Sequence, residues 1–104
     1  MSVYDPATGV FEQIDTCFSA DHNQMSEDNV LHFGQNGAVG WIDMDTWDET
    51  HDAEASQGWC PAVIDTNGDG RITEWTEPDA PVASALDHRI SFGCYSVAVS
   101  PADG

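Results

Sequence analysis

The sequence contains no lysine, and Arg71 and Arg89 are its only arginines. Against these two bases stand 19 Asp and Glu residues, so the formal net charge is −17. Phosphate backbones and anionic lipid headgroups repel such a chain, which argues against nucleic acid and membrane surfaces as partners. The acids are spread along the sequence, which suits a halotolerant protein in a salt-rich setting or one neutralised by bound divalent cations.

Several signatures of catalysis and targeting are also missing. No apolar run approaches the roughly 20 residues of a membrane helix, and the N-terminus lacks the basic start and apolar stretch of a signal peptide. The three cysteines form no C-x-x-C zinc pattern, and no phosphate-binding glycine loop precedes a helix. The histidines show no i, i+4 pair, and Cys17 with His22 lacks a third group to orient a base. We therefore expect no catalytic activity of the chain's own. The histidines are His22, His32, His51 and His88.

The 104 residues are nevertheless 40% hydrophobic and include four Trp and four Phe, enough for one small folded domain or fragment. A chain of this size buries a limited share of its surface, so a metal, a disulfide or neighbouring structure is expected to assist. Alternating apolar residues and turn dipeptides predict a mainly β fold. We expect a hairpin over 3–14, a strand pair over 21–33 and strands at 39–42 and 94–100. A short helix is expected within 46–57.

The most specific motif is Asp65-Thr66-Asn67-Gly68-Asp69-Gly70-Arg71-Ile72. Calcium takes six to eight oxygens, and D-x-N-x-D-G supplies side-chain oxygens from alternate residues while glycine permits the sharp turn. The pattern predicts Ca²⁺ bound by Asp65, Asn67, Asp69 and the Arg71 carbonyl. Ile72 is expected to anchor the loop to the core. The alternative is a bare hairpin turn between Ile64 and Ile72, because Asn-Gly and Asp-Gly are both strong hairpin signals.

The end of this loop departs from an EF-hand. Thr76 stands where the bidentate Glu would be, and Pro78 disfavours a second helix. The last ligand is left open between Thr76, Glu74 and Glu77, with Glu77 preferred because an extended exit would bring it within reach. A structural staple is therefore expected rather than a calcium sensor.

A second acidic run lacks the glycine that a calcium loop needs, and a solvated acidic face is the preferred interpretation. It comprises Asp43, Asp45, Asp48, Glu49 and Asp52.

An ordered series of short motifs gives the chain a family resemblance. They are Ile14-Asp15-Thr16-Cys17-Phe18, Val39-Gly40-Trp41, Asp48-Glu49-Thr50, Ser56-Gln57-Gly58-Trp59, Asp65-Thr66-Asn67-Gly68, Glu77-Pro78-Asp79 and Asp87-His88-Arg89-Ile90. The chain resembles exported bacterial β-propeller proteins with streptogramin-lyase-like, NHL-type repeats, and the resemblance extends from Tyr4 through Gly104.

The resemblance implies partial propeller blades in an extracellular or periplasmic protein. Residues 1–42 would form blade-like strands, 43–90 an acidic insertion with the calcium loop, and 91–104 the start of the next strand pair, so that the chain is a fragment. Unpaired blade edges would permit self-association. Cys60 and Cys94 depart from the family pattern, since similar sequences tend to have Thr and an aromatic residue there, and their joint occurrence suggests a Cys60–Cys94 disulfide, which would leave Cys17 free.

The leading functional hypothesis is a calcium-stapled fragment of a secreted propeller-type binding or scaffold protein with an unknown ligand. Two alternatives stay open. One is a free-standing calcium-dependent interaction module. The other is part of a lyase or hydrolase whose other catalytic residues lie outside the chain.

Overall fold

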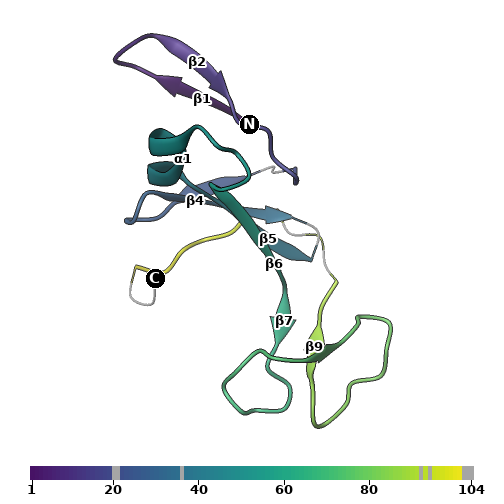
Figure 1. Cartoon of the computed structure of the whole chain (residues 1–104). Coiled ribbons are helices and arrows are strands. Elements are labelled where there is room, and N and C mark those ends of the chain that lie inside the picture. Colours follow the sequence, from purple (N-terminus) through teal and green to yellow (C-terminus); the bar gives the residue numbers. More distant parts are fainter. Residues whose placement is uncertain (20–21, 36, 92, 94, 102–104) are drawn as a thin grey trace.

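The computed structural model describes residues 1–19, 22–35, 37–91, 93 and 95–101. The fold is mainly β, with short and mostly antiparallel strands in three small sheets and one helix. The molecule is elongated, with principal extents of 54 × 27 × 23 Å and a radius of gyration of 16.2 Å. A compact domain of this length has a radius of gyration of about 13 Å. Figure 1 shows the cause, since the sheet of β7 and β9 projects away from the rest of the chain.

The N-terminal hairpin pairs β1 (Ser2–Asp5) with β2 (Val10–Gln13) and confirms the predicted hairpin. Asp5 organises the turn, because its carboxylate accepts hydrogen bonds from the Thr8 hydroxyl at 2.7 Å and the Ala7 amide at 2.8 Å. These bonds, the Thr8 bond first, hold the pKa of Asp5 below its usual value. Gly9 closes the turn at a φ of 71°.

The central sheet has four antiparallel strands in chain order. They are β3 (Asn23–Met25), β4 (Val30–Gln35), β5 (Ala38–Asp43) and β6 (Gln57–Pro61). The first three confirm the strands predicted within 21–33 and at 39–42. The fourth, β6, comes from the segment interpreted as an insertion, so this sheet crosses the predicted boundary after residue 42.

Helix α1 (Met44–Thr50) connects β5 to β6. Asp43 caps it, since its Oδ1 accepts from the amides of Asp45 and Thr46 at 3.1 Å and its Oδ2 from the Thr46 hydroxyl at 2.9 Å. The helix ends at His51, whose φ of 52° is left-handed. A short helix was predicted within 46–57, and α1 confirms it over 46–50, although the helix begins earlier, at Met44, directly after its Asp43 cap.

The hydrophobic core lies between the hairpin, the central sheet and α1. Its buried members are Ile14, Phe18, Phe33, Ile42, Met44 and Trp47. All of them, together with the partly buried residues packed on them, fall within residues 1–61. We call residues 1–61 the body.

Residues 62–90, all of which the structure describes, form a second region that we call the arm. Its sheet has the order β7-β9-β8, with β7 (Val63–Ile64) antiparallel and β8 (Trp75–Thr76) parallel to the central β9 (Asp87–Arg89). Residues 71–74 lead from the loop to β8 and belong to no helix or strand. Asp87 is the only buried residue of the arm.

The strand predicted over 94–100 is wrong for the residues that the structure describes, because 95–100 belong to no helix or strand. Cys94 and residues 102–104 lie outside the described residues. The segment still contacts the central sheet, since the Val99 amide donates to Gln24 Oε1 at 3.1 Å. In the described part of the chain, no helix is long and apolar enough to cross a membrane.

Candidate functional site

The predicted calcium loop starts where β7 ends, and Asp65 is its first organising residue. Asp65 Oδ1 accepts from the Gly68 amide at 2.6 Å, and Oδ2 accepts from the Gly70 amide at 2.8 Å. Gly68 and Gly70 have φ values of 77° and 75°, which side-chain-bearing residues rarely adopt. The two glycines therefore let the backbone curl around one carboxylate.

Two further bonds continue this pattern through the loop. Asn67 Oδ1 accepts from the Asp69 amide at 2.9 Å, and Asp69 Oδ1 accepts from the Arg71 amide at 2.8 Å. The three predicted ligand side chains within the loop, those of Asp65, Asn67 and Asp69, are thus each oriented by a backbone amide. Asp69 has a second carboxylate oxygen besides the one that accepts from Arg71, and the single side-chain oxygen of Asn67, like any oxygen that accepts one N–H, retains a lone pair for a cation.

The bare hairpin interpretation is wrong. A hairpin would pair Ile64 with Ile72, whereas Ile64 pairs with His88 of β9. Strand β9 separates the two ends of the loop, β7 and β8. The expected role of Ile72 is also wrong, because its side chain is 49% exposed and does not anchor the loop in a core.

The three candidates for the last ligand have other contacts. Glu77 Oε2 lies 3.0 Å from Arg89 Nη1 in an ion pair. The Thr76 hydroxyl lies 2.7 Å from His88 Nδ1 and 3.3 Å from the Asp87 carbonyl. Glu74 is exposed, and its backbone carbonyl accepts from the Asp87 amide at 3.0 Å.

Within the described residues, no group of three or more His, Cys, Asp and Glu side chains is placed to hold a metal ion. The loop itself offers a mixed set, with the carboxylates of Asp65 and Asp69, the amide of Asn67 and the carbonyl of Arg71. Hard cations such as calcium accept this mixture of oxygens. The set falls short of calcium's six to eight oxygens, so a bound ion would need ligands from outside the loop or from water.

Sequence reasoning missed Asp87. Its side chain is 0% exposed, its Oδ2 accepts only a long bond of 3.4 Å from the Thr73 amide, and its Oδ1 has no hydrogen-bond partner. Nothing in the local pattern Leu86-Asp87-His88 distinguishes this acid from the exposed ones. Its position follows only from the insertion of β9 between β7 and β8.

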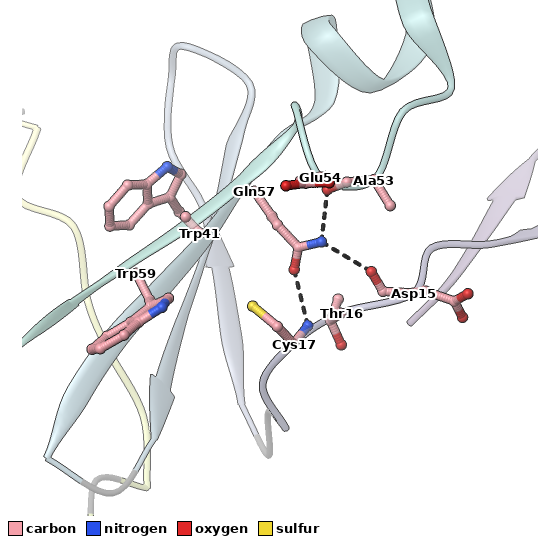
Figure 2. Close-up of a pocket in the computed structure, with 9 residues that line it drawn as sticks. Asp15, Thr16, Cys17, Trp41, Ala53, Glu54, Gln57 and Trp59 are labelled. Carbon is pink, nitrogen blue, oxygen red and sulfur yellow. Dashed lines mark hydrogen bonds between the residues drawn. The ribbon is translucent and has the colours of Figure 1, made fainter.

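A groove of about 780 Å³ lies on the body, at the edge strand β6. Figure 2 shows Gln57 at its centre. The Gln57 amide nitrogen donates to the carbonyls of Asp15 at 3.0 Å and Ala53 at 2.6 Å, and its oxygen accepts from the Cys17 amide at 3.1 Å. Gln57 thereby connects the segment after the hairpin to the segment after α1.

Two tryptophans border this groove. Trp41 lies over Gly58, where an added Cβ would stand 2.4 Å from Trp41 Cζ2, so only glycine fits beneath the ring. The Trp59 side chain is 55% exposed. The groove therefore combines aromatic surface with backbone and carboxylate oxygens, as ligand sites often do.

The second acidic run consists partly of local caps. Asp43 caps α1, Asp52 Oδ1 accepts from the amides of Glu54 and Ala55, and Asp45 accepts from Asn29. The histidines have separate contacts, for example His22 with Tyr95 and His51 with Glu12. Cys17 and Cys60 are exposed and form no disulfide with any described residue, and because Cys94 lies outside the described residues, the Cys60–Cys94 disulfide stays a prediction.

Comparison of the chain with family models, curated proteins and solved structures finds no match. The assignment of function therefore depends on the chemistry of the loop and of the groove.

Proposed function

We propose that this chain is a calcium-stapled part of a secreted, propeller-type binding or scaffold protein. The calcium ion binds in the loop through Asp65, Asn67, Asp69 and the Arg71 carbonyl. The observation that carries the proposal is the set of four backbone-amide bonds that orient these three side chains. A turn without a bound ion would not require oxygen-bearing side chains at alternate positions of the loop.

The composition of the arm supports a structural role for the ion. The arm buries no large apolar side chain, and Ile64, Ile72, Trp75 and Val82 are 38–60% exposed. Its strands are two or three residues long. Hydrophobic burial therefore contributes little to its stability, and a metal can supply the missing free energy by binding only the folded form.

The central sheet supports the propeller part of the proposal. Propeller blades are four-stranded antiparallel sheets, and β3 to β6 form one such sheet in chain order. Its two edge strands, β3 and β6, would pair with neighbouring structure or with second copies. The groove beside Trp41 and Trp59 is the ligand surface that we propose for the binding role.

A free-standing calcium-dependent module is the second candidate. It is favoured by the shared core, because the hairpin, the central sheet and α1 bury one common set of apolar side chains. The two candidates differ in oligomeric state, since free blade edges would self-associate whereas a finished module would stay monomeric.

Thermal unfolding of the chain with calcium chloride and with a chelator tests the calcium proposal. Ligand at 100 times its dissociation constant stabilises a folded protein by about 2.7 kcal/mol, so the midpoint should rise with calcium concentration. Sedimentation of the same samples measures the oligomeric state. An unfolding midpoint that is the same with calcium and with the chelator would overturn the proposal.

A further inference from the structure

The arm contains an unexplained buried carboxylate beside the proposed calcium loop. Asp87 is fully buried, and the described residues give its Oδ1 no hydrogen-bond partner. A buried carboxylate without a counter-charge is costly, and one long bond from the Thr73 amide offsets little of that cost. A positive charge is therefore expected near this oxygen.

Strand topology places Asp87 at the base of the loop. The loop leaves β7 after Ile64, which pairs with His88, and it re-enters the sheet at Trp75, which pairs with Asp87. The two ends of the loop thus flank the first two residues of β9, Asp87 and His88. Two further bonds hold them together, from the Thr66 hydroxyl to the Leu86 carbonyl at 2.9 Å and from the Asp87 amide to the Glu74 carbonyl at 3.0 Å.

We propose that, when calcium binds, Asp87 joins Asp65 and Asp69, with which it forms no metal-holding group in this structure, and completes the calcium site in the role that sequence reasoning gave to Glu77. This inference rests on the proposed calcium function. It identifies β9 as the strand that the ion ties to the loop. The ion would then connect two segments that are distant in the sequence, and so fix the order β7-β9-β8.

The competing counter-charge is Arg89, two residues along the same strand. Its Nε is also buried without a partner, while its Nη1 is paired with Glu77. If Asp87 served only to pair with Arg89, calcium would not perturb it. The two roles are therefore distinguishable by calcium titration.

Calorimetric titration of the full chain with calcium chloride provides the first test, on wild type, Asp87→Asn and Glu77→Gln. Both substitutions remove one negative charge from the arm. Loss of even an outer-shell partner costs about 10–100-fold in metal affinity, so we expect Asp87→Asn to weaken binding at least about tenfold. Glu77→Gln should change affinity far less. Equal affinities for wild type and Asp87→Asn would overturn the assignment.

A second test measures the NMR resonances of the side-chain carboxyl carbons in the wild-type chain. Its result does not depend on whether a variant folds. Calcium should shift the side-chain carboxyl resonance of Asp87 together with those of Asp65 and Asp69, and leave that of Glu77 in place. A shift of Glu77 with Asp87 unmoved would overturn the assignment while the calcium proposal stands. No calcium binding by wild type would instead defeat the proposed function itself.

Discussion

The body and the arm differ in the kind of interaction that stabilises them. The body collects six large apolar side chains in one cluster, with Phe33 2% exposed and Ile14 and Ile42 fully buried. The arm, whose 29 residues (62–90) are all described, buries only Asp87. It also contains both arginines of the chain. The body thus folds around a hydrophobic core, whereas the arm is organised by hydrogen bonds between polar side chains and backbone amides.

This difference shows how an acidic segment that buries no large apolar side chain can still form an ordered projection. Burial of apolar surface supplies about 25 cal/mol per Å², and the arm has little such surface to bury. Its carboxylates repel one another when no cation is bound, so the arm is expected to be the more labile region. Calcium would act on the arm selectively and leave the body almost unaffected.

The largest expected effect on the free energy of unfolding comes from truncating a core side chain of the body. Phe33→Ala should destabilise the chain by about 3–5 kcal/mol, because Phe33 is fully packed and its removal leaves a cavity. Ile72→Ala in the arm should change stability by no more than about 0.5 kcal/mol, since exposed positions contribute little. Urea unfolding measures both. Similar losses from the two variants would refute the contrast between body and arm.

The next largest effect should come from the loop. Asp65→Asn removes a carboxylate that both orients the loop and would bind the ion, so calcium affinity should fall at least about tenfold. Asp79→Asn, an exposed arm acid, is the control of equal charge change. Calorimetric titration compares the two. If both variants lost calcium equally, diffuse charge rather than a defined site would explain the binding.

Glycine substitution in the loop separates backbone conformation from charge. Gly70→Ala introduces strain at a φ of 75°, although no atom lies within 4 Å of the added Cβ. We expect weaker calcium binding and a melting transition of the body that does not move. Circular dichroism with and without calcium measures both quantities. An unchanged affinity would show that the left-handed turn at Gly70 is not needed for the site.

The smallest effect concerns the Asp43 cap of α1. Hydrogen bonds from the Thr46 amide first, and then from the Thr46 hydroxyl, hold the pKa of Asp43 below its usual value. The cap therefore contributes fully above the unfolded-state pKa of about 3.9, and the contribution is lost as pH falls through the lower folded pKa. Melting of Asp43→Asn and wild type from pH 7 to pH 2 should converge at the acid end.

The matched control for the cap is Asp48→Asn, an exposed helix acid to which no capping bond is assigned here. It removes the same charge from α1 and leaves the hydrogen bonds of the Asp43 cap in place. Parallel curves for Asp43→Asn and wild type down to pH 2 would contradict the capping account.

The elements that sequence predicted best are those with local signals. The hairpin follows from its Asp-Pro and Thr-Gly turn, and β4 and β5 follow from apolar alternation. The short helix was predicted in the right segment, whereas β6 was not predicted, because Gln57–Pro61 becomes a strand through its pairing with β5 and carries little local signal of its own. The loop residues were found from their spacing, whereas the burial of Asp87 depends on a β9 that returns between β7 and β8.

Amide hydrogen exchange with and without calcium tests the contrast between the two regions most directly. We predict that calcium slows exchange across the loop and at β7, β8 and β9, while amides of β4 and β5 exchange at the same rate in both conditions. Protection that rose equally in body and arm, or an arm that exchanged identically with calcium and with chelator, would contradict the account.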